Sequence, residues 1–245
     1  MYTPTIELEN VTVSYDRNVA LHGANLQVNQ GSIAGIVGMN GSGKSTLFKA
    51  IMGLEKLQSG RVLIQGKSIH KVPQRNLLAY IPQTEDVDWD FPISVYDVVM
   101  MGRYGYMNCL RIPRESDRRI VHQSLDRTQL TGLENRQIGE LSGGQKKRTF
   151  LARTLAQQGE IILLDEPFAG VDVKTEKAII ELLIELKNSG KTILISTHDL
   201  NSIATFCDQV ILVNKTILAY GAVADVFTPE NISRTFGGSV PQGLF

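Results

Sequence analysis

The amino-acid sequence predicts an α/β fold with a mainly parallel sheet, an antiparallel β portion at the N-terminus and a helical insert. Apolar runs at residues 33–37 and 161–164 have the length of strands that are covered on both faces. Helical patterns separate the strands, as right-handed crossovers between parallel strands require. Residues 84–140 break this alternation with helical patterns alone, and we interpret them as the insert.

The composition suits one globular domain. Of the 245 residues, 42% are hydrophobic and 20% are charged, which is enough apolar material for a sizeable core. We expect a single domain over residues 1–245, with a core of residues 1–83 and 141–245 and a helical subdomain of residues 84–140. Basic and acidic residues both number 25, so the net charge is zero and a generally basic nucleic-acid binder is not indicated.

Cysteines and apolar runs restrict the cellular setting. Cys109 and Cys207 lie far apart and lack Cys-x-x-Cys spacing, as is typical of thiols in a reducing compartment. The N-terminus has no basic start followed by an apolar block, so no signal peptide is expected. No apolar run approaches the ~20 residues that a bilayer-spanning helix needs. Work at a membrane would therefore require docking on a membrane protein.

The strands of the core are predicted from alternation and from turn residues. Apolar and polar residues alternate over residues 6–13, as in a half-buried strand. A second strand at residues 26–28 leads through the turn at 29–32 into the apolar run 33–37. Further strands are predicted at residues 58–66, 77–83, 191–196, 210–213 and 217–220, the last two as a hairpin.

The helices are predicted from caps and apolar faces. Ser94 and Asp97 have the spacing of a helix start, followed by an apolar face with Met100 or Met101 at its end. Residues 114–130 carry four apolar positions among many charges, which indicates an amphipathic surface helix. Other helices are predicted at residues 142–156, 174–187 and 199–206.

One glycine-rich stretch follows the apolar run 33–37 and precedes a helical pattern at 47–52. It reads Gly38-Met39-Asn40-Gly41-Ser42-Gly43-Lys44-Ser45-Thr46. Strand, glycine loop, Lys-Ser and helix form the context of a phosphate-binding loop, in which glycines let backbone N–H groups turn inward. Lys44 is placed to reach the β- and γ-phosphates, and the Ser45 hydroxyl to hold Mg²⁺. The stretch predicts nucleotide binding.

A second glycine turn begins the helix at residues 142–156. Leu141-Ser142-Gly143-Gly144-Gln145 contains a Ser-x-x-Gln capping box and makes a second anion-binding helix end. One phosphate loop already holds the single γ-phosphate of one nucleotide. The simplest interpretation is that the second end clamps a nucleotide held by another copy of the chain.

Polar residues at the ends of three apolar strands supply the chemistry. Asp165 closes the run 161–164 and can hold Mg²⁺, while Glu166 can orient or deprotonate the attacking water. His198 follows the next strand and could donate a hydrogen bond to the γ-phosphate. Gln83 ends a strand with an amide that can touch Mg²⁺ or the water.

Together these motifs resemble the ATP-binding subunit of ABC transporters over essentially the whole chain. The resemblance implies a P-loop NTPase core, ATP and Mg²⁺ as cofactors, an active ATPase, an ATP-sandwich dimer of two copies and an integral membrane permease as partner. It makes residues 38–46 the Walker A loop, residues 142–145 the signature, Tyr15 the adenine-stacking residue, Gln83 the Q-loop glutamine, Asp165 the Walker B aspartate, Glu166 the catalytic glutamate, Asp172 the D-loop residue at the dimer seam and His198 the switch histidine. One departure is Lys146-Lys147-Arg148, where Arg-Gln-Arg is common.

A narrower resemblance concerns the cargo. Residues 87–92, 98–105 and 230–238 look like ATPases of bacterial manganese, iron and zinc uptake systems. This resemblance implies metal import, a location on the cytoplasmic face of the cell membrane and an indirect partner in an extracytoplasmic metal-binding protein. The Gly102-Arg103-Tyr104 element is also similar to importers of siderophores or vitamin B12, which is the alternative cargo.

Two other classes compete with the transporter. A non-transport ABC ATPase in DNA repair or translation resembles coiled-coil, zinc-bearing or tandem arrangements, whereas this insert spans only residues 84–140. A small-molecule kinase would use the phosphate loop but would leave the signature at 142–145 unexplained. The aromatic residues Trp89 and Phe91 at the start of the insert either pack its core or line a groove for a permease helix.

Overall fold

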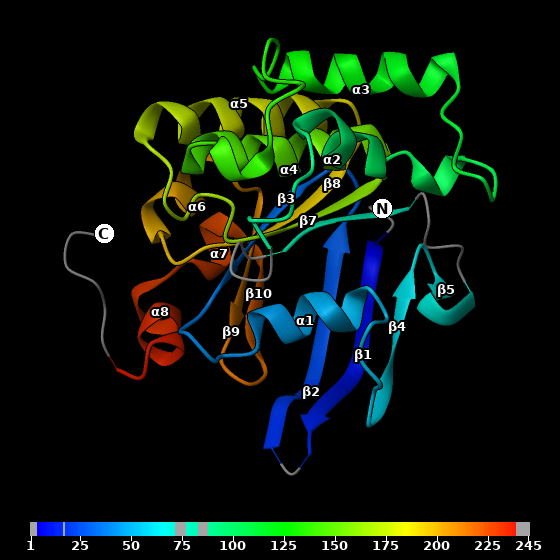
Figure 1. Ribbon diagram of the computed structural model, residues 1–245. Helices are drawn as coiled ribbons and strands as arrows, with labels where there is room; N and C mark the ends of the chain where they lie inside the picture. The colour runs from blue at the N-terminus through cyan, green and yellow to red at the C-terminus, as the bar shows by residue number, and fades with distance from the viewer. Residues whose placement is uncertain (1–3, 17, 72–76, 83–87, 239–245) are drawn as a thin grey trace. The chain divides into compact units, whose positions relative to one another are not determined.

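The computed structural model describes residues 4–16, 18–71, 77–82 and 88–238. It divides the chain into two compact units, the first comprising residues 1–74 and 186–245 and the second residues 75–185. The predicted fold class is confirmed, because the chain contains an antiparallel N-terminal sheet, parallel strand pairs and a set of helices (Figure 1). The separate helical subdomain at residues 84–140 stays a prediction.

The N-terminal sheet of the first unit is antiparallel. Its strands are β1 (Pro4–Tyr15), β2 (Asn18–Asn29), β4 (Ser59–Ile64) and β5 (Lys67–Ser68), in the order β2-β1-β4-β5, and η1 (Ile69–Lys71) follows β5. The predicted alternation is confirmed, since Ile6, Leu8, Val11 and Val13 are all buried. Helix α1 (Lys44–Ile51) packs against β1 and β2, so the helix after the glycine loop has a sheet for support (Figure 1).

A second row of strands in the first unit carries the glycine loop at the carboxyl end of its strand β3 (Ile33–Val37). It runs in the order β10-β9-β3-β8, with β8 (Thr192–Ser196), β9 (Gln209–Val213) and β10 (Ile217–Ala222). Strand β3 pairs in parallel with both β8 and β9, and all five of its residues are buried, as its continuous apolar run requires. Strands β9 and β10 form the predicted antiparallel hairpin.

The described part of the first unit also contains the helices α6 (Leu200–Phe206), α7 (Val223–Val226) and α8 (Pro229–Thr235). Helices α7 and α8 were not among the elements predicted from sequence. Thr228 caps α8 by accepting a hydrogen bond from the Asn231 N–H at 3.3 Å, and Pro229 takes the first helical position. Ile232 of α8 is buried in a cluster with Val37 and Leu212, which fixes α8 onto strands of this unit.

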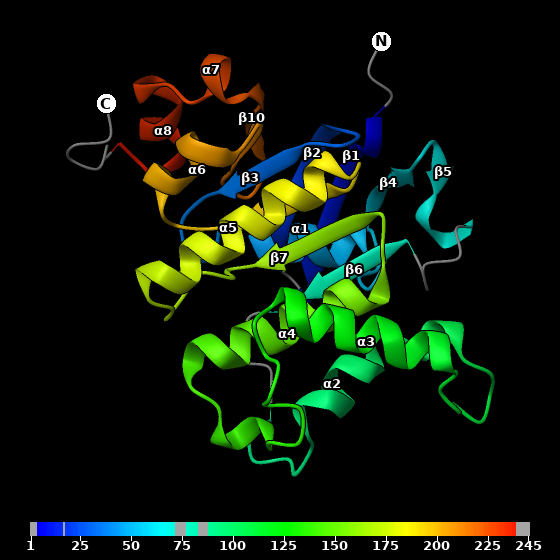
Figure 2. The same ribbon diagram turned by 90° about the horizontal axis from the view of Figure 1, so that it is seen from above.

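The second unit combines one parallel strand pair with helices. Strands β6 (Leu78–Ile81) and β7 (Ile161–Asp165) pair in parallel. The helices are α2 (Val95–Met101), η4 (Tyr104–Tyr106), α3 (Glu115–Arg127), η5 (Ile138–Glu140), α4 (Gly143–Gln157) and α5 (Val173–Asn188), the last of which leads into the first unit. Helices α2, α3 and α4 lie against one another (Figure 2). Across the described residues, no helix has both the length and the apolar character to span a bilayer.

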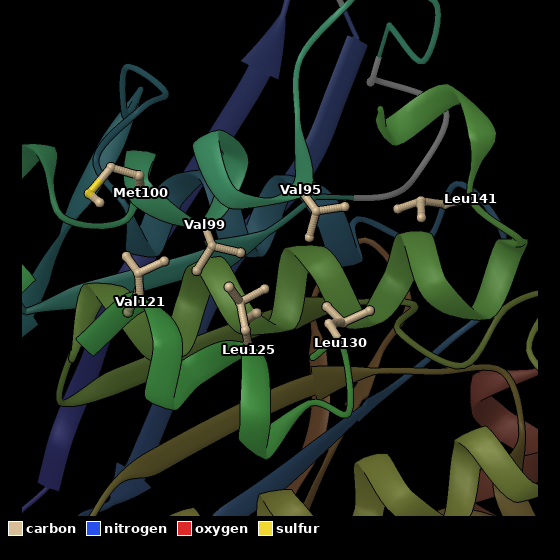
Figure 3. Close-up of a cluster of buried hydrophobic side chains, with 9 residues drawn as sticks. Val95, Val99, Met100, Val121, Leu125, Leu130 and Leu141 are labelled. Atoms are coloured by element: carbon tan, nitrogen blue, oxygen red, sulfur yellow. The ribbon is translucent and has the colours of Figure 1, made fainter. Parts of the chain in front are cut away.

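An apolar cluster holds α2, α3 and α4 together. Its members come from the three helices and from the segments just after α3 and just before α4, namely Val95, Val99, Met100, Val121, Leu125, Leu130, Leu141, Ala152 and Ala156. Figure 3 shows the labelled valine, leucine and methionine side chains of this cluster gathered together. Met100 is buried and Met101 is 38% exposed, which decides the alternative that the sequence left open. The predicted cap of α2 is confirmed, since the Asp97 N–H donates to the Ser94 hydroxyl at 3.1 Å.

A buried ion pair joins the loop after α2 to the start of α3. Arg103 Nε lies 3.0 Å from Asp117 Oδ1, and both side chains are nearly inaccessible to solvent. Arg103 also donates to the Ala156 carbonyl at 2.8 Å, while the other Asp117 oxygen accepts the Arg114 N–H at 3.0 Å. Burial raises the pKa of Asp117, but the hydrogen bonds from Arg114 and Arg103 outweigh it and the net pKa is lowered.

Replacing Asp117 by alanine is expected to destabilise the fold by about 3 to 5 kcal/mol, because it leaves the Arg103 charge buried and unpaired. Since the folded-state pKa of Asp117 is lowered, its stabilisation is present above the unfolded-state pKa of about 4 and is lost as the pH falls through the folded-state pKa. The difference in urea midpoint between the wild type and Asp117→Ala should therefore be full at neutral pH and shrink below about pH 4.

Glu9→Gln is the matched control for this prediction. Glu9 pairs with Arg61 at 2.6 Å on an exposed surface, so the substitution removes the same charge where water can replace the partner. Its urea midpoint should stay close to that of the wild type. An equal fall of the urea midpoint in both variants would contradict the conclusion that burial makes the Arg103–Asp117 pair important for stability.

Candidate functional site

The glycine loop at residues 38–46 joins β3 to α1, and its glycines are required by geometry. Gly43 has φ +105°, and a Cβ there would lie 2.8 Å from the Ala20 carbonyl oxygen. A Cβ at Gly38 would lie 2.2 Å from the Val213 carbonyl oxygen. No side chain of the described residues caps the N-terminus of α1, and its first turn has no acidic residue. The helix start is therefore open to an anion.

Two polar side chains of the loop indicate the kind of ligand that it binds. Lys44 is buried, and its Nζ donates to the carbonyl oxygens of Gly38 at 2.8 Å and Met39 at 3.1 Å. The Ser42 hydroxyl is also buried and has no hydrogen-bond partner among the described residues. A buried hydroxyl without a partner is costly unless a ligand supplies one. The loop thus fits a phosphate group.

Neighbouring strands brace the loop from outside. The Lys215 N–H, in the turn between β9 and β10, donates to the Ser42 carbonyl at 2.7 Å. The His22 N–H of β2 in turn donates to the Lys215 carbonyl at 2.7 Å. The loop is therefore bonded to the hairpin, and the hairpin to the N-terminal sheet.

Tyr15 and His198 belong to the same unit as the loop. Tyr15 ends β1 with its ring partly exposed, and its hydroxyl donates to Glu55 Oε1 at 3.0 Å. Burial of the hydroxyl raises the pKa of Tyr15, and a hydrogen bond with the Thr46 side chain of the loop opposes that shift. His198 is exposed two residues after β8, whose Ser196 pairs with Ile36 of β3. Both residues thus lie at the margins of the loop.

The two predicted carboxylates lie at the carboxyl end of β7 in the second unit. Asp165 is the last residue of β7 and is buried, whereas Glu166 is half-buried. Glu166 adopts φ +50°, a left-handed conformation that costs a non-glycine residue roughly 1 to 2 kcal/mol. Consecutive residues with such different backbone conformations direct their carboxylates differently, which suits two separate roles.

The signature residues and Asp172 lie beside one another in the same unit. The predicted capping box of α4 is confirmed, since Ser142 Oγ accepts the Gln145 N–H at 3.3 Å and Gln145 Oε1 accepts the Ser142 N–H at 2.9 Å. A Cβ at Gly144 would lie 3.3 Å from Thr175 Oγ1 and 3.8 Å from Asp172 Oδ2. Hydrogen bonds from the Thr175 N–H and hydroxyl hold the pKa of Asp172 below its usual value.

Lys147 is a residue that the motifs did not single out beyond its departure from the common pattern. Its side chain is buried beneath α4, and its Nζ donates to the Glu166 carbonyl oxygen at 3.1 Å. Burial lowers the pKa of the Lys147 ammonium, and the charges of Glu166 and Asp165 oppose that shift. In the sequence, the signal for this contact was the lysine itself. If its ammonium is buried, it needs hydrogen-bond acceptors.

The predicted residues therefore form two groups, one in each unit. The first group contains the loop at 38–46, Tyr15 and His198, and the second contains Ser142, Gly143, Gly144, Gln145, Asp165, Glu166 and Asp172. Gln83 lies outside the described residues. The Ser45 hydroxyl and the Asp165 carboxylate are oxygen donors of the kind that Mg²⁺ prefers.

Comparison with known proteins agrees with this geometry. The model of the ABC transporter family matches residues 21–169. The chain is 60% identical over 234 residues to the manganese transport system ATP-binding protein MntA of Synechocystis sp., covering 95% of this chain and 90% of the relative. It is 58% identical over 236 residues to the chelated iron transport system membrane protein YfeB of Yersinia pestis, covering 96% and 80%.

A solved structure shows the same fold. It is the dimeric post-hydrolysis state of an ATP-binding cassette bound to ADP and Pi, which matches with a TM-score of 0.79 and 27% identity over 89% of this chain and 98% of that chain. The phosphate loop, the capped signature helix and the matches over nearly the full length lead to one conclusion: the chain is an ATP-binding domain and belongs to the ABC transporter family.

Proposed function

We propose that this chain hydrolyses ATP to drive the import of a metal ion, manganese, iron or zinc, through a separate membrane permease. The proposed metal cargo is supported by the identity of 60% and 58% to relatives named for manganese and chelated iron transport. The alignments span 95% and 96% of this chain, so they include most of residues 84–140.

The glycine loop would bind the nucleotide phosphates. Its N–H groups and the open start of α1 favour an anion, and the Lys44 ammonium can exchange its two carbonyl acceptors for phosphate oxygens. The Ser42 hydroxyl, for which the described residues offer no hydrogen-bond partner, supports this proposal. The partly exposed ring of Tyr15 offers a surface for adenine, and His198 would donate to the γ-phosphate.

Ser45, Asp165 and Gln83 would hold Mg²⁺, which neutralises charge on the phosphates when it is bound. Glu166 would act as the general base for the attacking water, because it is the residue after Asp165 and its backbone leaves the strand conformation there. The left-handed backbone of Glu166 is the observation that supports this division of labour.

A second copy of the chain would complete each site. Ser142, Gly143, Gly144 and Gln145 would clamp a nucleotide held by Lys44 of the other copy, and Asp172 would lie at the seam. The capping box supports this proposal, since it prepares the helix end while leaving Ser142 and Gly143 exposed. The dimeric cassette bound to ADP and Pi is a structural precedent.

An integral membrane permease would dock on the second unit, with the chain held peripherally at the cytoplasmic face and an extracytoplasmic metal-binding protein as an indirect partner. Among the described residues of this unit, five large apolar side chains are exposed: Phe91, Met101, Leu110, Ile112 and Val173. Trp89 instead packs edge-on against Phe150 at 5.5 Å, so of the two aromatic residues Phe91 is better placed to contact a partner.

Uptake assays test the proposed cargo. In a strain that lacks this chain, accumulation of radioactive manganese should be restored by the wild type and not by Glu166→Gln, since both bind nucleotide and only one hydrolyses it rapidly. Ferrous iron, zinc and a ferric siderophore are supplied in parallel. Rescue with the siderophore alone would favour the alternative cargo, and rescue with none of the four would contradict import of metals.

A further inference from the structure

Lys147 is a charged residue in an apolar setting. It lies in the second turn of α4, five residues after Ser142, with only 6% of its surface exposed. A small cavity of about 10 Å³ beside it is otherwise lined by Ile81, Leu151, Leu164, Pro167 and Ile179. An ammonium group is not tolerated in such surroundings without acceptors. The acceptor that the structure gives it is the Glu166 main-chain carbonyl, at 3.1 Å.

The same carbonyl belongs to the strained residue of the site. Glu166 has φ +50°, a conformation that persists only where surrounding contacts enforce it. Its carbonyl oxygen accepts the Ala169 N–H at 3.3 Å, which is a local turn bond, and Lys147 Nζ, which comes from another helix. Both donors together use the two lone pairs of the oxygen. Of these two bonds to the carbonyl, the one from Lys147 ties the backbone of Glu166 to another helix of the unit.

We propose that Lys147 is a positioning residue that fixes the main chain of Glu166 and thereby the direction of its carboxylate. The proposal rests on the proposed function of Glu166 as the general base. It also gives α4 two tasks: its first turn carries the signature, and its second turn holds the catalytic segment of the same chain. A shift of α4 would consequently be felt at Glu166.

This role predicts a specific kinetic pattern. Lys147 bonds the backbone of Glu166 and belongs to a different group of residues from the phosphate loop, so its loss should affect the chemical step more than nucleotide binding. A small displacement of a catalytic group from its productive position lowers the rate of the chemical step strongly. We expect Lys147→Met to lower kcat by about 10- to 100-fold with KM for ATP nearly unchanged.

Lys147→Met is chosen because methionine keeps the unbranched apolar stem that fills the space between Leu151 and Ile179, while it removes the donor and the charge. Lys147→Arg restores a cationic donor and should recover much of kcat. Lys146→Met is the matched control: it removes the same charge from the neighbouring position of α4, where Nζ lies 4.5 Å from the Trp89 ring centre. Its kcat should equal that of the wild type.

Glu166→Gln is measured beside these variants so that two failures can be told apart. If Glu166→Gln is inactive and Lys147→Met hydrolyses ATP at the wild-type rate, the positioning role is overturned and the proposed function stands. If Glu166→Gln still hydrolyses ATP rapidly, the assignment of the base fails and the role of Lys147 falls with it.

Thermal melting separates positioning from packing. A melting temperature that falls equally in Lys147→Met and Lys147→Arg, together with a raised KM, would overturn the proposal in favour of a packing role. If Lys147→Met does not fold, Lys147→Gln decides, because its amide is too short to keep the bond. A reduced kcat at unchanged KM in that variant supports the proposal, and a wild-type kcat overturns it.

Discussion

Glu166→Gln is expected to lower the rate of ATP hydrolysis by about 10²- to 10⁴-fold while nucleotide binding is retained. The amide has the shape of the carboxylate and lacks its basicity. The backbone of residue 166 should keep its hydrogen bonds, because Ala169 and Lys147 donate to its main-chain carbonyl, which the substitution retains. Phosphate release measures the rate, and calorimetry with ATP and Mg²⁺ measures the affinity. A variant that binds normally and hydrolyses at the wild-type rate would exclude Glu166 as the base.

The same variant should accumulate as a dimer. Slow hydrolysis would prolong the proposed state in which two copies share two nucleotides, each between Lys44 of one copy and Ser142 of the other. Light scattering with saturating ATP and Mg²⁺ should therefore report a doubled mass that disappears when the nucleotide is removed. A strictly monomeric Glu166→Gln chain under these conditions would contradict the shared site.

Lys44→Ala is the second large effect. Hydrogen bonds to charged groups contribute about 1.5 to 3 kcal/mol, so removing the ammonium should weaken ATP binding by about 10- to 100-fold. The substitution also removes the bonds from Nζ to the Gly38 and Met39 carbonyls, which loosens the loop. Titration calorimetry with ATP checks the affinity, and hydrolysis should fall with it.

Lys49→Ala is the control for that substitution. Lys49 lies in the last turn of the same helix, so the variant loses an equal charge away from the loop. Its ATP affinity should match that of the wild type. If Lys44→Ala and Lys49→Ala bind ATP equally well, the loop at residues 38–46 is not the phosphate site.

The local features of the fold could be predicted from sequence because each has a dense signal within a few residues. The caps at Ser94 and Ser142 follow from side chains three positions apart, and the buried strand β3 follows from an unbroken apolar run. Helix α8 also had a signal in Thr228-Pro229, but the helix is short, and its stability comes from burying Ile232 among residues distant in the chain.

The long-range contacts of the site could not be predicted in this way. Lys147 and Glu166 are 19 residues apart, and the bond between them depends on the tertiary packing of α4. Similarly, the Gly102-Arg103-Tyr104 element suggested a cargo class, whereas the structure gives Arg103 a buried partner in Asp117. Motifs name the residue types that a site needs; the tertiary fold decides which of those residues support one another.

The bonds from His22 to Lys215 and from Lys215 to Ser42 have a thermodynamic consequence. A loop that is already bonded to a hairpin and a sheet does not have to order itself when the nucleotide arrives, so little conformational entropy is lost on binding. The heat capacity change should then reflect the surface that the ligand itself buries, without the large negative value of coupled folding. The loop would thus be rigid before ATP binds. The free energy of ATP binding would then remain available for the association of two copies.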